Sequence, residues 1–497
     1  MKILLINPPF TQYASEVEIQ ADEPLGLMYL AAYLKEKNIN VEILDVFMGL
    51  ESIAAEDNFF RSGISDEEIK NKIIEYNPDI VGIASMFTMH SKGVHDVAKI
   101  IKSVSQDILV IVGGSHASSL PEVVLEDDNI DIVVMGEGEE TLVEIINKFK
   151  EKQDIFEIFG TAIRQNNKIK INKHREFIKD MDTLPYPARD LVDMSVYLND
   201  KYRNLLAMAT PRANVITSRG CPYYCPYCSI HSIWKHSWRA ISAKKVVDEI
   251  EFLVKKYGIR EIAFQDDNLT LDKKRMHQIC DEILKRKLNI KWCTPNGVAI
   301  WTLDKELLRK MKRSGCYKLT FGIETGSLNT QRFIRKTHID LEKSKEIIRY
   351  CNKIGMWTHS AFIIGFPYET KEDIEETINY AISSDLDLAA FFIATPFPGT
   401  ELYSLYRDEG LLDRGLGDSK QIKWIGCQQR PMCNTKYFKR EELEEYLRDA
   451  HKRFYHSRIY KFMNPLRLLR KFTGLSEIKY FLKLLRIYNT TVGNLTN

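Results

Sequence analysis

The sequence predicts an α/β protein in three parts: an N-terminal doubly wound parallel sheet, a partial barrel of six βα units, and a mostly helical C-terminal region. Short apolar runs alternate with amphipathic stretches over residues 1–150 and again from Asn214. This alternation is typical of buried parallel strands that are each followed by a helix. A chain of 497 residues has room for about three domains. We expect domains at 1–150, 206–410 and 411–497, with a connector at 151–205.

The composition excludes several classes of protein. Hydrophobic residues make up 44% of the chain and charged residues 28%, so the chain can bury a large core. The 70 Lys and Arg against 68 Asp and Glu leave +2, which gives no electrostatic reason to expect nucleic-acid binding. No apolar run reaches the roughly 20 residues of a membrane span. Nine cysteines are sparse and odd in number, which argues against a disulfide framework. We predict a soluble, cytoplasmic enzyme with a metal site.

Apolar runs predict the strands of the first part. The expected strands are Ile3–Ile6, Val41–Val46, Ile80–Ala84, Ile108–Val112 and Ile130–Met135. The first run is broken by Asn7-Pro8-Pro9, so it is read as a strand and not as a secretory signal. Two later runs end in Gly113-Gly114 and Gly136-Glu137-Gly138. Glycines at the carboxyl ends of parallel strands favour a ligand site there, although ordinary tight turns are the alternative.

The connector and the barrel follow. Pro185 and Pro187 predict an extended connector. The expected barrel strands are Val215–Ser218, Glu261–Phe264, Lys291–Thr294, Lys318–Ile323, His359–Ile364 and Ala389–Ala394. Residues 242–257 form one of the amphipathic helices between them. Six βα units are too few for a closed eight-fold barrel, so we expect a partial one.

The C-terminal tail is predicted to be helical and basic. From Tyr460 to the end, seven basic residues oppose Glu477 alone, and apolar residues repeat at helical spacing. The basic residues are Lys461, Arg467, Arg470, Lys471, Lys479, Lys483 and Arg486, and the apolar ones are Leu475, Ile478, Leu482 and Leu485. Such a segment either docks on an anionic membrane or a lipid-like substrate, or packs on its own domain with a solvated face.

Three cysteines in the string RGCPYYCPYCSI carry the strongest signal of chemistry: Cys221, Cys225 and Cys228. Thiolates are soft ligands that suit zinc or an iron–sulfur cluster. Structural zinc takes four ligands, so His231 or His236 would have to complete the set, and that alternative stays open. Three ligands on a four-iron cluster would leave one iron open.

The CxxxCxxC pattern after the first strand of a partial barrel resembles the radical S-adenosylmethionine (SAM) superfamily. The resemblance implies that the open iron of a 4Fe-4S cluster binds SAM. One electron, from a reductant such as flavodoxin or ferredoxin, then cleaves SAM into methionine and a 5′-deoxyadenosyl radical. The strings FQDDNLT, LTFGIETGS and IIGFPYET resemble the family's later strand ends. The SAM-binding residues that the resemblance implies are Tyr227, Asp266, Asp267, Glu324, Ser327 and Gly365. At the third strand end, Asn296-Gly297 stands where the family pattern leads us to expect an arginine.

The first 150 residues resemble the Rossmann-like cobalamin-binding domain that is fused to many radical SAM proteins. The strings PLGLMYLAAYLKE, PDIVGIAS, VGGSHAS and IDIVVMGEGEET carry this resemblance. The histidine motif for cobalt ligation is absent, since its position reads INPPFTQY; His90 is the nearest alternative ligand. We expect cobalamin without a protein histidine. The contacts implied are Ser85, Thr88, Gly113, Gly114, His116, Gly136, Glu137 and Gly138.

Together, the two resemblances imply a cobalamin-dependent radical SAM enzyme, often a class B methyltransferase. The expected reaction moves a methyl group from methylcobalamin to an unactivated carbon after hydrogen abstraction. A ring rearrangement or an oxidative cyclisation, and a cobalamin- or zinc-binding regulator without radical chemistry, are the alternatives. Trp234, Trp238 and the basic tail favour a small amphiphilic or antibiotic-like substrate over a tRNA. No catalytic acid or base is predicted.

Overall fold

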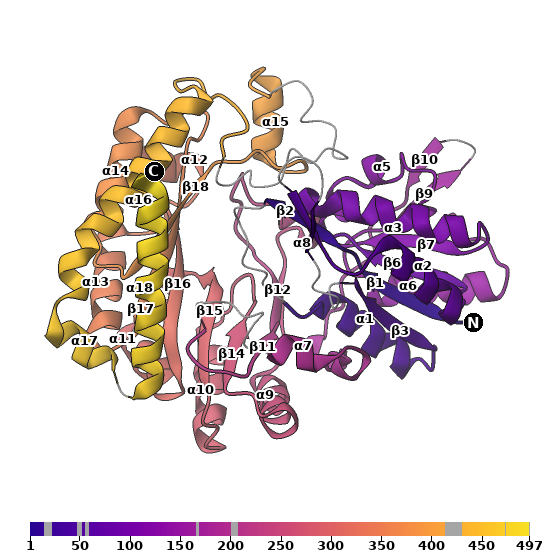
Figure 1. Cartoon of the computed structure of the whole chain (residues 1–497), viewed down its shortest axis with the longest axis horizontal. Helices are drawn as coiled ribbons and strands as arrows, with labels where there is room; N and C mark the ends of the chain where they lie inside the picture. Colours follow the sequence, from indigo (N-terminus) through magenta and orange to yellow (C-terminus); the bar gives the residue numbers. More distant parts are fainter. Residues whose placement is uncertain are drawn as a thin grey trace.

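The computed structural model describes residues 1–13, 22–46, 52–54, 59–165, 168–199, 207–412, 430–472 and 474–496. Figure 1 shows two sheets beside each other, with the N-terminal one on the right and the barrel on the left. The C-terminal helices cover the outer side of the barrel, away from the N-terminal sheet. The three predicted parts are therefore present in the expected order.

The N-terminal sheet has seven strands in the order β10-β9-β8-β7-β6-β1-β3. Their bounds are Ile3–Asn7 (β1), Val41–Asp45 (β3), Ile80–Ala84 (β6), Leu109–Gly113 (β7), Ile132–Val134 (β8), Thr161–Gln165 (β9) and Lys168–Ile171 (β10). The first five are parallel, and all but the edge strand β3 are largely buried, which confirms the doubly wound sheet. β9 and β10 extend it antiparallel from within the expected connector.

Helices cover both faces of this sheet because each has one apolar stripe. On one face lie α2 (Asp66–Tyr76) and α3 (Ser91–Val104), whose apolar residues share a core with β6 and β7. On the other face lie α1 (Leu25–Glu36) and α6 (Glu139–Lys150). A small antiparallel sheet of β2 (Phe10–Tyr13), β5 (Phe59–Ser62) and β4 (Ser52–Ala54) was not predicted.

The barrel sheet has six parallel strands in the order β11-β14-β15-β16-β17-β18. Their bounds are Arg212–Val215 (β11), Glu261–Phe264 (β14), Lys291–Val298 (β15), Cys316–Glu324 (β16), Trp357–Ile364 (β17) and Leu388–Ile393 (β18). The helices between them are α9 (Ala243–Tyr257), α10 (Lys273–Lys285), α11 (Lys305–Arg313), α12 (Leu328–Phe333), α13 (Leu341–Lys353) and α14 (Lys371–Ser383). The partial six-stranded barrel is confirmed.

The first barrel strand lies earlier than predicted. β11 ends at Val215, because the backbone and hydroxyl of Thr217 and the hydroxyl of Ser218 donate to Asp266 instead of continuing the ladder. The chain then forms β12 (Ser218–Gly220), which pairs with β13 (Trp238–Ala240) outside the barrel.

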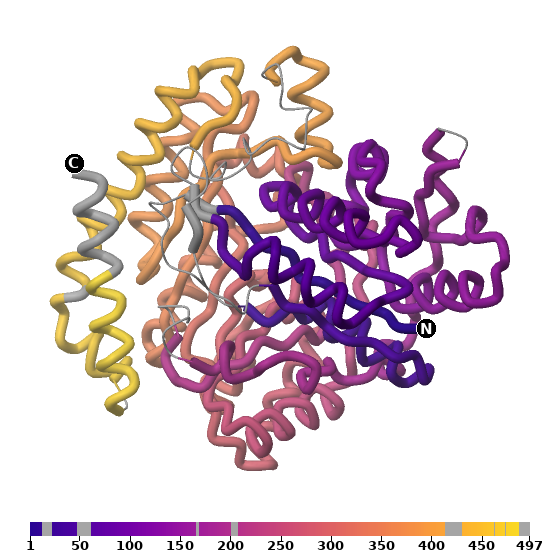
Figure 2. The backbone as a smooth tube through the Cα atoms, turned by 45° about the vertical axis from the view of Figure 1, so that its right-hand side comes forward, coloured from indigo at the N-terminus to yellow at the C-terminus, as the bar shows by residue number. Residues whose placement is uncertain are grey.

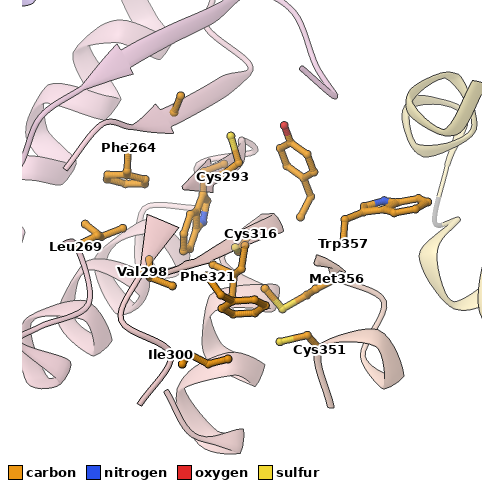
Figure 3. Packing of buried hydrophobic residues seen from close by; sticks show 14 of the residues in the cluster. Phe264, Leu269, Cys293, Val298, Ile300, Cys316, Phe321, Cys351, Met356 and Trp357 are labelled. Atoms are coloured by element: carbon orange, nitrogen blue, oxygen red, sulfur yellow. The ribbon is translucent and has the colours of Figure 1, made fainter. Parts of the chain in front are cut away.

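Close packing of apolar side chains holds the barrel strands to their helices. Figure 3 shows Cys316, Phe321, Cys351 and Met356 grouped in this core, with Phe264 at some distance on the β14 side. These two cysteines are fully buried free thiols, and they act as small apolar side chains. They are thus separated in role from the three cysteines of the predicted cluster.

α15 (Glu401–Asp408) follows the last barrel strand, and the C-terminal region consists of α16 (Arg440–Phe462), α17 (Pro465–Lys471) and α18 (Leu475–Thr496). Figures 1 and 2 show the last three stacked on the outside of the barrel. Tyr480 of α18 contacts the rings of Tyr317 and Trp357, near the first residues of β16 and β17. α18 therefore covers the amino-terminal end of the barrel. Within the described residues, no helix is long and apolar enough to cross a membrane.

A buried ionic network attaches α17 to the barrel. Lys471 is fully buried and donates to Asp387 at 2.7 Å and to the carbonyl of Met356 at 2.7 Å. Arg467 donates to the second oxygen of Asp387 at 2.8 Å. Burial alone would raise the pKa of Asp387, but the two cations hold it below its usual value. Part of the basic tail is thus used inside the protein.

We expect Asp387→Ala to lower the free energy of unfolding by about 3–5 kcal/mol, because it leaves Lys471 as a buried cation without its carboxylate. Urea unfolding, followed by near-UV circular dichroism, measures this loss. Asp408→Ala is the matched control, since Asp408 is exposed and should change stability by less than about 0.5 kcal/mol. Equal stability of the two variants would contradict this account.

Candidate active site

The three predicted cluster cysteines lie in one loop between β12 and α8 (His231–Trp234). Gly220 begins the loop with a φ of +88°, and a Cβ there would lie 2.2 Å from the carbonyl oxygen of Ser237. Only glycine therefore lets the chain turn at this point. All three thiols are free, and burial raises the pKa of Cys228 to about 12, with further upward contributions from Cys221 and Cys225. The loop brings three soft donors into one neighbourhood.

A buried lysine lies beside this loop. Lys336 Nζ donates to Glu324 Oε1 at 3.0 Å and to the carbonyl of Gly322 at 3.0 Å. Its positive charge acts to lower the pKa of Cys225, which burial raises overall. Glu324 ends β16 with a φ of +70°. Three thiolates next to a fixed cation are a donor set that fits an anionic iron–sulfur cluster. The sequence analysis did not identify Lys336, because the residues around it form no motif that indicates a role.

Each histidine of the zinc alternative has one ring nitrogen beside a backbone carbonyl, while His231 Nε2 is buried without a hydrogen-bond partner. His231 Nδ1 and His236 Nδ1 lie 3.1 Å and 3.3 Å from backbone carbonyl oxygens, and both rings stack on Tyr224. Among the described residues, no three His, Cys, Asp or Glu side chains converge as they would around one metal ion. The geometry of a single zinc ion is therefore not formed by the described side chains.

The two adjacent aspartates differ. Asp266 is buried and accepts three hydrogen bonds from Thr217 and Ser218, so its carboxylate is already used inside the protein. Asp267 has solvent-accessible atoms and accepts one hydrogen bond, from the backbone N–H of Gly220 at 2.9 Å. Desolvation raises the pKa of Asp267 to about 6, and Asp266 contributes in the same direction. Asp267 is the aspartate that can still receive a ligand.

Two of the remaining predicted SAM contacts, Ser327 and Gly365, follow the ends of later strands, and the third, Tyr227, lies in the cysteine loop. Ser327 is fully buried, caps α12 and donates to Asp373 at 2.6 Å, so its hydroxyl is occupied. The backbone N–H of Gly365, at a φ of +82°, donates to Glu369. Tyr227 packs at 5.9 Å from the ring of Phe366. These residues shape the loops around the cysteines.

The predicted cobalamin contacts surround the carboxyl ends of β6 and β7. Ser85 Oγ and His116 Nε2 are buried without a hydrogen-bond partner, and His116 Nδ1 lies 3.1 Å from Thr88 Oγ1. A Cβ at Gly114, whose φ is +119°, would lie 2.5 Å from the carbonyl oxygen of Ser85. Orphaned buried polar atoms beside a glycine turn fit a polar ligand such as the edge of a corrin. Gly113, the last residue of β7, has no such close approach.

His90 lies near this region, in a short 3₁₀ turn before α3. Its Nδ1 is buried without a partner, and its ring packs against Phe10 at 5.3 Å. Burial lowers the pKa of His90 to about 4 and that of His116 to about 4. Both imidazoles are therefore neutral at physiological pH.

The turn Gly136-Glu137-Gly138 links the N-terminal sheet to the cysteine loop. Glu137 accepts from Arg219 at 2.7 Å and from Arg239 at 2.9 Å, while Glu139 accepts from Arg219 at 2.6 Å. All four side chains are largely buried. Arg219 precedes Cys221 by two residues, so the N-terminal sheet is joined directly to the cysteine loop.

A second contact joins the same two parts. Ser119, at the end of α4 (Ser115–Ser119), and Ser232, in α8, share a hydrogen bond of 2.6 Å. Figure 1 shows α8 and β12 between the two sheets. The glycine turns of the first sheet and the cysteine loop thus border one region.

Known proteins resemble the whole chain. The radical SAM superfamily model matches residues 215–381, and the B12 binding domain model matches residues 22–146. An uncharacterized methyltransferase of Pyrococcus horikoshii is 35% identical over 92% of this chain and 92% of its own. Cytidylyl-2-hydroxyethylphosphonate methyltransferase of Streptomyces wedmorensis is 32% identical over 83% of each chain.

A solved structure supports the fold. The radical SAM methyltransferase TsrM of Kitasatospora setae, with cobalamin and a 4Fe-4S cluster bound, aligns with a TM-score of 0.72 at 16% identity, over 100% of both chains. The sequence relatives, the two family models and this fold agree. The chain belongs to the family of cobalamin-dependent radical SAM methyltransferases.

Proposed function

We propose that this protein transfers a methyl group to an unactivated carbon of a small molecule after hydrogen abstraction. The observation that carries the proposal is the contact from Glu137 and Glu139 to Arg219, which ties the glycine turns of the first sheet to the cysteine loop. A substrate between these two parts would meet both reactive centres. When bound, the cluster and SAM supply a 5′-deoxyadenosyl radical, and cobalamin supplies the methyl group.

In this proposal, the chain's residues bind and orient the cofactors. Cys221, Cys225 and Cys228 hold the cluster. Asp267 would bind the ammonium of SAM and Glu324 its ribose, and Lys336 would keep the Glu324 carboxylate in place. Asp266 and Ser327 support these contacts from behind, because their own polar atoms are already used.

On the other side of the site, the N-terminal sheet holds cobalamin. Ser85, Thr88 and His116 offer polar side chains, and Gly114 allows the backbone to approach the ligand. The turn at Gly136 and Gly138 offers a backbone without side chains. Glu137 keeps a structural role, because two arginines already occupy its carboxylate.

The electron donor and the cellular location follow from the same chemistry. A one-electron reductant such as a flavodoxin or a ferredoxin is required to start the reaction. All described cysteines are free thiols, which suits the reducing conditions of the cytoplasm.

Cys225→Ala tests the proposed function. With iron, sulfide and hydroxocobalamin supplied anaerobically, the wild type should hold about four irons and one cobalt per chain. The variant should lose most iron, and its cleavage of SAM to 5′-deoxyadenosine should fall by at least about 100-fold, because the cluster is the electron source. Cys280→Ala, in the buried core of α10, is the control that should keep both. Zinc in place of iron in the wild type would contradict the proposal, as would a product that gains no methyl group.

A pair of adjacent glycines tests the cobalamin contacts. Gly114→Ala should reduce bound cobalt at least about tenfold, because the new Cβ would collide with the Ser85 backbone and must adopt a disfavoured φ. Gly113→Ala should bind normally, since the nearest atom to its Cβ lies at 3.7 Å. Cobalt and iron contents are measured together by mass spectrometry. Retained iron with lost cobalt isolates the effect, while equal cobalt in both variants would refute the assignment.

The tail also supports a membrane contact in this proposal. Seven large apolar side chains are exposed on α16, α17, α18 and the turn after α16, and we name them the tail surface: Tyr460, Met463, Leu466, Leu469, Leu475, Ile478 and Leu482. Arg470 and Lys479 are exposed among them. Glu477, the one acidic residue between positions 460 and 486, is buried against Lys291. An exposed apolar face with cations and no exposed acid complements an anionic bilayer.

We expect the full-length protein to sediment with vesicles of phosphatidylcholine and phosphatidylglycerol, and only weakly with phosphatidylcholine alone. Replacing Leu466, Leu469 and Leu475 by serine should weaken binding at least about tenfold, because each leucine contributes apolar area. Ile74→Ser, on the exposed face of α2, is the control. Unchanged binding of the triple variant, or no binding of the wild type, would rule the contact out.

A further inference from the structure

One buried asparagine beside the cysteine loop has no role in the site described so far. Asn268 lies between β14 and α10 and is only 4% exposed. Among the described residues, its Oδ1 has no hydrogen-bond partner, although the atom is buried. A buried carbonyl without a donor costs free energy, so a side chain that only supports the fold would normally be paired. This asparagine therefore needs an explanation.

The amide nitrogen of Asn268 faces the first cysteine of the loop. Its Nδ2 lies 4.0 Å from Sγ of Cys221, with the N–H as donor and the sulfur as acceptor. Burial raises the pKa of the Cys221 thiol, whereas the backbone N–H of Tyr223 and the Asn268 amide act against this rise. The amide thus favours the thiolate, which is the form that binds iron.

Hydrogen bonds fix the place of Asn268 along the chain that enters the cysteine loop. The two residues before it, Asp266 and Asp267, accept hydrogen bonds from residues 217–220. Asn268 comes next and meets Cys221, which is the next residue of that chain. The two segments are therefore paired in order up to the first cluster cysteine. The contact with the sulfur is the last step of this pairing and not an isolated approach.

The backbone of Asn268 is held from other sides as well. Its carbonyl oxygen accepts from Trp238 Nε1 at 3.1 Å, and Trp238 begins β13, the partner strand of β12. The next residue, Leu269, is 1% exposed and packs in the barrel core. The amide is therefore kept beside the sulfur by contacts that do not involve the side chain itself.

We propose that Asn268 is a positioning residue, whose Nδ2–H donates to the sulfur of Cys221 when the cluster is bound and thereby raises the reduction potential of the cluster. This inference rests on the proposed function, because it takes Cys221 as a cluster ligand. Hydrogen bonds to the ligand sulfurs are among the factors that set the potential of an iron–sulfur cluster. A donor favours the reduced state, because that state carries more negative charge. The bond would therefore make the cluster easier to reduce by its one-electron donor.

The charges near Cys221 do not confuse the test of this bond. Lys336 and Asp267 act on the Cys221 sulfur with opposite signs. Asn268 is itself neutral, so replacing it by another neutral residue leaves both charges in place. A change in the potential then reports on the amide and not on the net charge of the site.

The test measures the midpoint potential of the cluster in the full-length protein, loaded with iron, sulfide and hydroxocobalamin. The cluster is titrated with titanium(III) citrate, and its reduced state is followed by low-temperature electron paramagnetic resonance. Asn268→Leu removes the donor but keeps the volume, and should lower the equilibrium constant for one-electron reduction about tenfold, a fall of about 59 mV. Asn268→Gln retains an N–H donor and should keep part of the potential. Asn289→Leu, at an exposed site before β15, is the control that should change nothing.

Asn268→Ala separates the loss of the donor from the entry of water, which also affects the potential. Equal falls in Asn268→Ala and Asn268→Leu support the hydrogen bond. A fall in Asn268→Ala alone would be due to water and would overturn the proposal, as would an unchanged potential in Asn268→Leu. Iron should stay at about four per chain in every variant, because all three cysteines remain.

Two further outcomes count against the proposal in different ways. A loss of iron from the Asn268 variants would show that the side chain holds the loop together, and would overturn the assigned role. A wild type without any cluster would fail the Cys225→Ala test as well. An unchanged potential in a fully loaded Asn268→Leu variant, in contrast, overturns this inference alone and leaves the proposed function standing.

Discussion

The ionic contact among Glu137, Glu139, Arg219 and Arg239 is the constraint on which the site depends. Each of these charges is largely removed from water, so separating them would leave uncompensated buried charge on both sides. Arg219 lies in the short strand that leads into Cys221. The position of the cysteine loop is therefore determined by the N-terminal sheet as well as by the barrel. Chemistry in which two cofactors face one substrate requires a fixed contact of this kind between the two domains that hold the cofactors.

Features that depend only on residues close together in the sequence could be predicted. Continuous apolar runs such as Ile80–Ala84 identify buried parallel strands, because both of their faces must be covered. The CxxxCxxC spacing identified the cluster loop for a similar reason, since its three ligands lie within eight residues. The glycine turn at Gly113-Gly114 could be predicted because the two glycines are adjacent and directly follow a predicted strand. These features need no knowledge of a distant partner.

Features that depend on distant partners could not be predicted. Asp266 and Asp267 are neighbours of the same chemical type, yet only the Asp266 carboxylate accepts hydrogen bonds from Thr217 and Ser218, some 50 residues earlier in the chain. The same contact ended β11 early. Lys336 and Arg219 carried no signal, because a lysine or an arginine becomes notable only when its carboxylate is known. The pairing of β9 and β10 with the first sheet could not be predicted for a related reason, because no apolar run in the sequence indicates it.

α18 joins two properties that sequence reasoning treated as alternatives. Its buried residues, Glu477, Tyr480 and Leu484, recur at the period of a helix and close the amino-terminal end of the barrel. Its exposed residues, Leu475, Ile478 and Leu482, recur at the same period on the opposite face. Because α18 has apolar residues on both faces and only one face packs on the barrel, its second apolar face stays uncovered. The same helix can therefore close the amino-terminal end of the barrel, where Tyr480 packs against Tyr317 and Trp357, and still present the tail surface outward.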